Sequence, residues 1–356
     1  MTGPSARPPF GGGPTLADVA RAAGVSPATA SRALHGAPGR TVRAELAARV
    51  LEAARALHYV PNSAAQAMSR GRSSTVGLLV PDIADPFAAA VAAGVMARSA
   101  AADLIVSVAA TGGDPAMEIR HLNQLRHQRA SVAVLAGSRF TDLEAERALA
   151  AEVDEFIAGG GRVAAVGRAM PGVHSVVIDN IDGAARMAGL LVSLGYRRFA
   201  VLAGPENLAT SEDRLTGFRR GLAAAGVPLP DEHVLSAPYS RDGGYVGMAE
   251  LLDQGLDPDV LDAVFAVNDV MAIGAMAALA ERGYRVPDDV AVAGFEDVPM
   301  LRDIRPALTT VSLPLDEIGV LAMDLALETG HDSSDATPRH VPVRCEVTVR
   351  DSTPAR

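Results

Sequence analysis

The sequence has a single cysteine, Cys345, among 356 residues. A disulfide within the chain needs two cysteines, and a cysteine-based zinc site needs more than one, so both are excluded. The chain also has no uninterrupted apolar run of about 18 residues, the length that a transmembrane helix needs. Its first 14 residues are rich in proline and glycine and lack the apolar stretch of a secretory signal. We therefore expect residues 1–14 to be a disordered tail and the protein to be cytoplasmic, with no membrane partner.

The motifs of several enzyme classes are missing as well. The sequence has no G-x-S-x-G, no P-loop and no H-E-x-x-H. The three glycines at 159–161 precede an expected strand, whereas a dinucleotide-binding loop follows one. The eight histidines are scattered, and His121 and His127 lie six residues apart, which does not suit a shared metal on one helix face. We expect no enzymatic activity, no cofactor and no metal.

Charge is divided unevenly along the chain. Residues 1–72 contain nine arginines and only three acidic residues, whereas the remaining 23 arginines are outnumbered by 39 acidic residues. A basic segment joined to an acidic body predicts a polyanionic partner, such as nucleic acid, for the first segment only. The alternative is a set of arginines that are simply solvated at the surface.

Residues 15–60 have the pattern of three short helices. Thr15 can cap a first helix, and Gly24 stands where a left-handed cap is expected after its last apolar residue. Ser26 followed by Pro27 then marks the start of a second helix. Two helices joined by so tight a turn predict an all-α helix-turn-helix domain, with a third helix closing its core. An ordinary three-helix bundle with a polar face is the alternative.

The second of these helices has one small, polar face that carries a cation. In a helix-turn-helix this helix enters the major groove, where the guanidinium of Arg32 matches the O6 and N7 acceptors of guanine. The hydroxyls of Ser26, Thr29 and Ser31 suit phosphate oxygens. The DNA-binding residues that we expect in this domain are Thr15, Leu16, Ser26, Pro27, Ala28, Thr29, Ser31, Arg32 and His35.

The stretch TLADVARAAGVSPATASRALH, followed by YVPNSAAQAM, resembles the LacI/GalR family of bacterial transcriptional repressors. In that family two hinge helices pair, enter the minor groove and insert an apolar wedge between base pairs. The resemblance implies a hinge helix and linker over residues 61–74. It assigns groove contacts to Asn62, Ala65 and Gln66 and the wedge to Met68, where leucine is usual. It also implies palindromic operator DNA as the partner. Because the C-terminal residues DSTPAR contain no leucine heptad, we expect no helical tetramerisation tail and therefore a homodimer.

Residues 75–351 alternate apolar runs of strand length with helical stretches, and this rhythm restarts near residue 179. The repetition predicts two α/β lobes with parallel sheets, and a ligand cleft where the carboxyl ends of the strands meet. The resemblance implies a periplasmic-binding-protein-like body crossed three times by the chain. Its expected parts are lobe 1 (75–178 and 313–332), lobe 2 (179–312 and 338–351) and a tail (352–356).

Polar and aromatic side chains that follow strands are the candidates for effector binding. Asp82 can accept hydrogen bonds from ligand hydroxyls, and Phe87 can stack on a sugar or base. Arg214 matches the family's R-x-x-G motif, and its guanidinium suits paired hydroxyls or a carboxylate. An Asp or Asn at such a position can instead be the cap of the next helix. The expected effector residues are Asp82, Phe87, Arg168, Arg214, Asn268 and Glu296, and Tyr239 is a possible second aromatic wall.

The function expected is therefore a sequence-specific transcriptional regulator, most simply a repressor, controlled by a small effector in the cleft. A sugar is the first choice of effector, with a nucleoside or purine as the alternative. A solute-binding protein of a transporter would share the lobes, but it needs a signal sequence and leaves the basic segment unexplained. An α/β enzyme acting on sugars is the third reading, which a turnover assay would reveal.

Overall fold

The computed structural model describes residues 13–35, 42–60, 72–137, 141–328 and 337–356. The chain forms two compact units, Met1–Ser73 and Ser74–Arg356. The predicted hinge contacts Asn62, Ala65, Gln66 and Met68 lie outside the described residues, as does most of the expected tail 1–14. Within the described ranges, no helix has the length and apolar character needed to cross a membrane.

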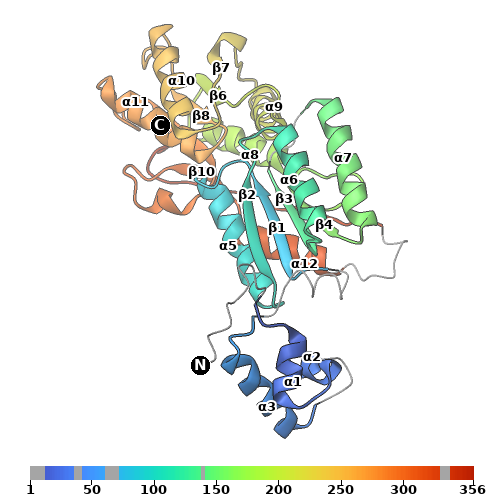
Figure 1. The fold of residues 1–356 in the computed structure, drawn as a ribbon. Helices are drawn as coiled ribbons and strands as arrows, with labels where there is room; N and C mark the ends of the chain where they lie inside the picture. Colours follow the sequence, from blue (N-terminus) through green and yellow to red (C-terminus); the bar gives the residue numbers. More distant parts are fainter. Residues whose placement is uncertain (1–12, 36–41, 61–71, 138–140, 329–336) are drawn as a thin grey trace, which may run out of the picture. The chain divides into compact units, whose positions relative to one another are not determined.

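The first unit contains helices α1 (Leu16–Ala23), α2 (Pro27–His35) and α3 (Ala44–Ala56) (Figure 1). The Thr15 side chain accepts a hydrogen bond from the Asp18 amide, while the Asp18 carboxylate accepts one from the Thr15 amide, which completes a capping box. Gly24 ends α1 in the left-handed region with φ 62°. The N-cap at Thr15 and the left-handed C-cap at Gly24 that the sequence predicts are therefore both present. The small core consists of Val19, Ala20, Ala23, Ala30, Val50 and Ala54.

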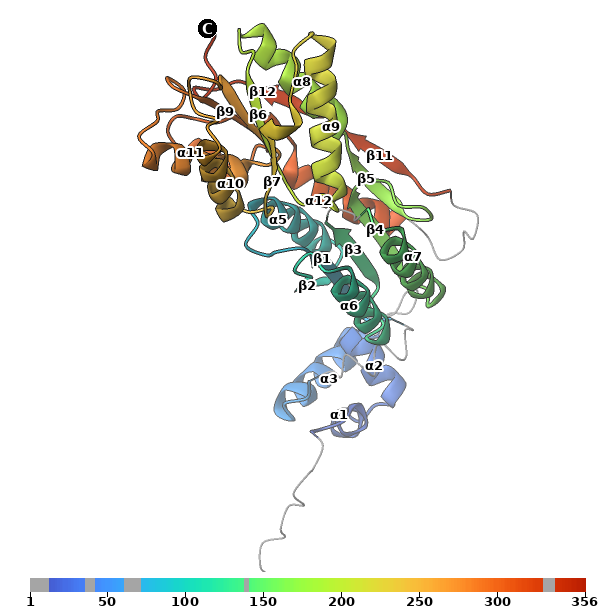
Figure 2. The same ribbon diagram turned by 90° about the horizontal axis from the view of Figure 1, so that it is seen from above.

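The second unit begins with a six-stranded parallel sheet in the order β11-β5-β4-β3-β1-β2. Side chains of β1 alternate between two apolar cores, with Leu78 in one and Leu79 in the other, because successive residues of a strand face opposite sides. Helices α5 and α12 pack together on one side, and α6 and α7 on the other (Figure 2). The strands are β1 (Thr75–Val80), β2 (Ile105–Ala110), β3 (Val132–Ala136), β4 (Arg162–Gly167), β5 (His174–Ile178) and β11 (His340–Val343). The helices are α5 (Pro86–Ala100), α6 (Pro115–His127), α7 (Leu143–Ala158) and α12 (Leu315–Glu328).

A second six-stranded sheet has the order β12-β10-β9-β8-β6-β7 and is parallel except for β12. Helices α8 and α9 form one tightly packed pair, and α10 and α11 form another. The strands are β6 (Phe199–Ala203), β7 (Val234–Ser236), β8 (Ala263–Ala266), β9 (Ala291–Glu296), β10 (Thr309–Ser312) and β12 (Glu346–Thr348). The helices are α8 (Asn180–Ser193), α9 (Ala209–Ala224), α10 (Arg241–Asp253) and α11 (Asp269–Glu281), with short 3₁₀ turns at Asp231–His233 and Pro299–Arg302.

The chain passes between the two sheets after β5, after β10 and after β11, which gives three crossings. The assignment of residues 338–351 to the second lobe is wrong for His340–Val343, which pair with β5 in the first sheet. The edge of β5 offers unpaired backbone groups that this segment satisfies. The expected tail 352–356 is also wrong at its start. Ser352 is fully buried, donates to the Val292 carbonyl and accepts from the Thr309 amide.

Glycine allows the close approach of α8 and α9. A Cβ atom on Gly217 would lie 2.2 Å from the Ile181 carbonyl oxygen. We expect Gly217→Ala to push the helices apart and to lower the free energy of unfolding by about 1–3 kcal/mol, measured by urea denaturation. Gly189→Ala is the matched control, because a Cβ there meets no atom within 4 Å and should stabilise α8 by about 0.5–1 kcal/mol. Equal effects of the two substitutions would contradict this account.

Candidate functional site

A cavity of about 680 Å³ lies where the carboxyl ends of strands from both sheets converge. The first lobe contributes the segments after β1, β2, β3 and β4, and the second contributes residues near the starts of α9 and α10 together with Glu296 at the end of β9. This position is the one expected for ligands of open parallel sheets. The volume falls within the range of small-molecule sites.

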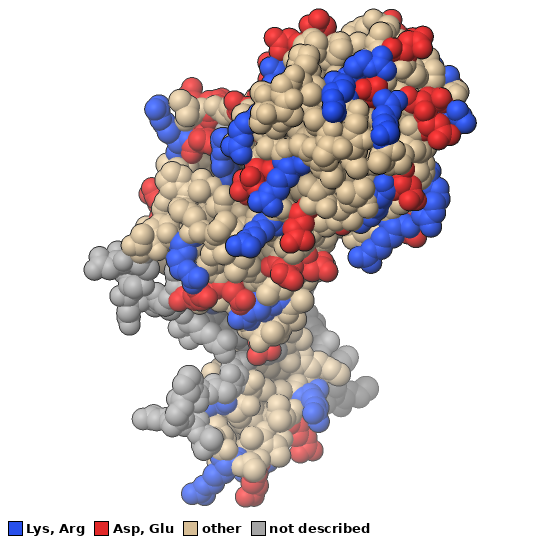
Figure 3. Space-filling view, turned by 180° about the vertical axis from the view of Figure 1, so that it is seen from behind, with Lys and Arg blue, Asp and Glu red and all other residues tan. Residues whose placement is uncertain are grey.

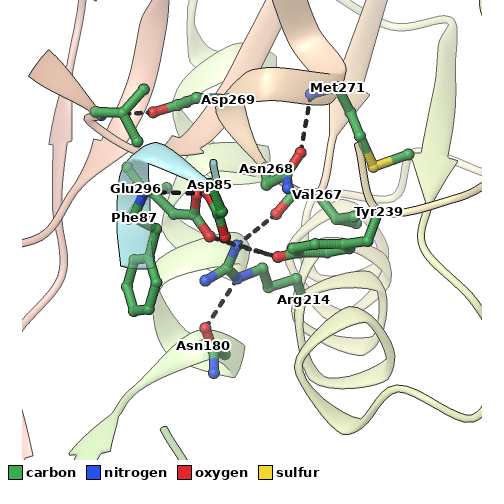
Figure 4. Close-up of polar contacts among 12 residues, drawn as sticks. Asp85, Phe87, Asn180, Arg214, Tyr239, Val267, Asn268, Asp269, Met271 and Glu296 are labelled. Carbon is green, nitrogen blue, oxygen red and sulfur yellow. Dashed lines mark hydrogen bonds and ion pairs between the residues drawn. The ribbon is translucent and has the colours of Figure 1, made fainter. Parts of the chain in front are cut away.

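Arg214 is the central side chain of this site (Figure 4). It lies on α9, is 1 % exposed and lines the cavity. Its guanidinium stacks 3.9 Å above the Phe295 ring. Its hydrogen bonds fix the plane of the guanidinium: Nε donates to Asn180 Oδ1 (2.9 Å), and Nη1 donates to Tyr239 Oη (2.8 Å), the Val267 carbonyl (2.7 Å) and Glu296 Oε1 (2.9 Å).

Glu296 supplies the counter-charge and one unused acceptor. Its Oε2 atom is buried and has no hydrogen-bond partner among the described residues. Burial raises the pKa of Glu296, and the neighbouring Arg214 opposes that rise. Burial also raises the pKa of Tyr239 well above 10, so its phenol stays protonated. The site thus presents a fixed guanidinium, a neutral hydroxyl and an unsatisfied carboxyl oxygen, a set that can bind a polar ligand.

The backbone at the end of β9 is strained. Glu296 and Asp297 have φ angles of 117° and 59°, a region that non-glycine residues rarely adopt. The Asp297 carboxylate accepts hydrogen bonds from Ser312 Oγ (2.5 Å) and Arg350 Nη2 (2.7 Å), which hold this conformation. Strain retained by its surroundings is typical of ligand-binding positions.

Four of the six residues predicted for effector binding line the cavity: Asp82, Phe87, Arg214 and Glu296. The structure does not bring the other two there. Arg168 forms an ion pair with Asp213 of α9 (3.0 Å). Asn268 is fully buried, and its Oδ1 accepts from the Met271 amide and caps α11. The capping alternative is therefore the correct reading for Asn268.

Sequence reasoning missed Asp85, which also lines the cavity. Its Oδ1 accepts from the Phe87 amide, so Asp85 caps α5, while the exposed Asp82 accepts from the Ala84 amide in a local turn. The dipeptide Asp85-Pro86 was the available signal, because aspartate followed by proline marks the start of a helix. Tyr239, left open as a loop residue or an aromatic wall, lines the cavity and accepts from Arg214.

Asp269 is a second buried carboxyl near the site. It accepts hydrogen bonds from the Val298 amide (3.0 Å) and the Thr310 hydroxyl (2.6 Å), and burial raises its pKa to about 7. The folded protein therefore retains a proton that the unfolded chain releases at about pH 4. As a result, the free energy of unfolding should fall as the pH rises from about 4 through 7.

We expect Asp269→Asn to remove the part of this fall that comes from Asp269, which amounts to as much as about 4 kcal/mol. The asparagine oxygen can accept from the Val298 amide, and its amide can donate to the Thr310 hydroxyl, so the packing is retained. Urea denaturation at pH 5 and pH 8 measures the difference. Burial also raises the pKa of Glu296, to about 8, so Glu296 leaves a slope of the same sign and of comparable size in the variant. An unchanged pH dependence in the variant would show that Asp269 is ionised in the folded protein.

The first unit exposes Ser26, Pro27 and Ala28 at the beginning of α2. Ser26 Oγ accepts from the Thr29 amide (3.1 Å) and caps the helix as predicted. Arg32 Nε donates to the Ala28 carbonyl (2.9 Å), so the guanidinium lies along its own helix in this structure.

Charges in the second unit are mixed. Figure 3 shows arginines interspersed with carboxylates over the visible face of this unit. Among the described residues, no group of three or more His, Cys, Asp or Glu side chains could hold a metal ion.

Comparison with known proteins places both units. Residues 15–62 match the model of "Bacterial regulatory proteins, lacI family", and residues 188–353 match that of a "Periplasmic binding protein-like domain". The transcriptional regulator GalR of Escherichia coli K12 is 31% identical over 315 residues, which are 88% of each chain.

Two solved structures extend the likeness over nearly the whole chain. The lac repressor dimer bound to operator and the anti-inducer ONPF is 25% identical, with a TM-score of 0.82 over 97% of this chain and 100% of that one. The complex of the transcriptional regulator CelR with cellobiose is 30% identical, with a TM-score of 0.68 over 95% and 99%. The relatives are transcriptional regulators and not enzymes. The chain belongs to the lacI family of bacterial transcriptional regulators.

Proposed function

We propose that this protein is a cytoplasmic repressor whose affinity for palindromic operator DNA is set by a sugar bound between its two lobes. The observation that carries the proposal is the cavity around the buried Arg214, built from the strand ends of both lobes. A ligand that contacts both lobes favours one relative position of them. It can therefore couple to a DNA-binding unit on the same chain.

In the DNA-binding unit, α2 enters the major groove of each half-site. Arg32 leaves the Ala28 carbonyl and donates to a guanine edge, and the hydroxyls near the start of α2 contact phosphates. A homodimer supplies two such helices for a palindrome. The structure of the lac repressor as a dimer bound to operator supports this arrangement. The predicted contacts from Thr15, Leu16, Ser31, His35 and the hinge residues Asn62, Ala65, Gln66 and Met68 complete this interface.

In the effector site, Arg214 and Glu296 bind hydroxyl groups, and Phe87 packs against the apolar face of the ring. Asp82, Asp85 and Tyr239 add polar contacts from the cavity wall. The cellobiose held by CelR supports a sugar as the ligand class. A nucleoside uses the same donors and acceptors and is the alternative outcome of the test.

The test is a thermal-shift screen of sugars and nucleosides with the full-length protein, repeated with an operator duplex selected from a random library. A true effector raises Tm through mass action. Its effect should differ in the presence of operator, because effector and DNA binding are coupled. Removing residues 1–73 should abolish DNA binding and leave the effector shift intact. Turnover of any sugar in the screen would contradict the proposal.

A further inference from the structure

The charges that line the cavity are unbalanced. Four carboxyl groups and only two guanidinium groups are present among its lining residues: Asp82, Asp85, Glu118 and Glu296 against Arg214 and Arg241. Both cations already have carboxylate partners. Arg214 bonds to Glu296 at 2.9 Å, and the half-exposed Arg241 bonds to Asp242 at 2.9 Å.

Asp85 is a partly buried carboxyl at the cavity wall, and its side chain accepts a hydrogen bond from a backbone amide and not from an arginine. Its hydrogen bond from the Phe87 amide fixes it at the start of α5, at the cavity wall. Burial raises the pKa of Asp85 and the nearby Asp82 raises it further, whereas the hydrogen bond from the Phe87 amide and the charge of Arg214 lower it. In its ionised form Asp85 repels an anion in the cavity, and its partial burial reduces the screening by water.

The cavity has few of the usual elements of an anion site. Phosphates are bound in proteins by helix N-termini and by arginines free to form paired hydrogen bonds. Here the N-terminus of α5 is occupied by its own Asp85, and three of the four hydrogen bonds of Arg214 use a single nitrogen, Nη1. The start of α9 at Ala209 has no side-chain cap, so this helix N-terminus is open at the cavity, and its amides can donate to hydroxyl oxygens as well.

We propose that the cavity selects effectors without negative charge, neutral polyhydroxy compounds or amino sugars, and that Asp85 is the residue that rejects sugar phosphates and uronates. This inference rests on the proposed function, because it assumes that the effector binds here. It narrows the ligand class by charge, which the sugar assignment alone does not do.

Matched pairs of ligands test the inference. Galactose, glucose, ribose and adenosine are each compared with galactose 6-phosphate, glucose 6-phosphate, ribose 5-phosphate and AMP, at constant ionic strength, by thermal shift and calorimetric titration. Galacturonate and galactosamine complete the set. The expected result is that the neutral or amino member of a pair raises Tm and its anionic counterpart does not. A phosphate ester that binds as tightly as its parent would overturn the inference and leave the sugar-responsive regulator intact. No response from any member would overturn both.

Asp85→Asn separates charge from shape. Asparagine is also a good helix cap, so α5 should keep its start. The ratio of Kd for the phosphate to Kd for its parent should fall about tenfold, because one partly buried negative charge at the cavity wall is removed. Asp142→Asn is the matched control: Asp142 caps α7 in the same lobe, is exposed and is not among the cavity-lining residues, so the ratio should not change. An unchanged ratio in Asp85→Asn would show that rejection is steric and would overturn the role of Asp85.

Discussion

Replacing Arg214 with methionine is expected to abolish the effector response and to lower the free energy of unfolding by about 3–5 kcal/mol. Methionine retains the length of the side chain and its apolar contact with Phe295, but it removes every hydrogen bond of the guanidinium. Glu296 is then left as a buried carboxyl without a cation, which is the costly part of the change. Urea denaturation measures the loss of stability, and calorimetric titration with the effector found in the screen measures the loss of binding.

The double variant Arg214→Met/Glu296→Gln distinguishes the two effects. It removes the unpaired charge and should recover much of the stability, while effector binding should remain lost. An effector Kd unchanged in this double variant would place the effector elsewhere. If Arg214→Met alone were as stable as the parent protein, the ion pair between Arg214 and Glu296 would contribute no net stability.

The second large effect is expected in the DNA-binding unit. Arg32→Ala should weaken binding to the selected operator by at least about 30-fold, since each lost arginine–guanine pair is worth about 1–3 kcal/mol and a dimer loses two. Binding to random duplexes should change little, and effector binding should not change. Fluorescence anisotropy with operator and scrambled duplexes measures both.

Arg55→Ala is the control for charge alone. Arg55 is exposed in the last turn of α3, within the same unit, and no base contact is predicted for it. It should cause a small loss that is the same for operator and scrambled duplexes. If the two variants lost operator affinity equally, Arg32 would act only as a positive charge and not as a reader of sequence.

The sequence predicted the ends of the first two helices correctly. The caps at Thr15 and Ser26 and the left-handed Gly24 depend on residues within three or four positions, so their pattern was sufficient. Arg214 was found through a motif resemblance, and its position at the cavity agrees with that choice. The alternation of apolar runs with helical stretches in the body predicted two sheets of parallel strands, and only β12 departs from this pattern within the described residues.

Most of the errors concern contacts between distant parts of the chain. His340–Val343 is a short strand that could pair with the edge of either sheet. Only tertiary packing decides that it pairs with β5. Arg168 follows a strand as a ligand residue would, yet its partner Asp213 lies 45 positions away. Asn268 and Asp85 have the same sequence context, a polar residue before a helix. Only the fold shows that Asp85 faces the cavity and Asn268 does not.

A single titration measures whether operator binding and effector binding are coupled. The full-length protein is titrated onto its selected operator duplex at fixed salt, with and without saturating effector. We expect at least a fivefold change in operator Kd, and the effector Kd should change by the same factor when operator is present, because coupling is reciprocal. Equal affinity for operator and scrambled duplexes, or an operator Kd that no bound effector alters, would contradict the proposed function.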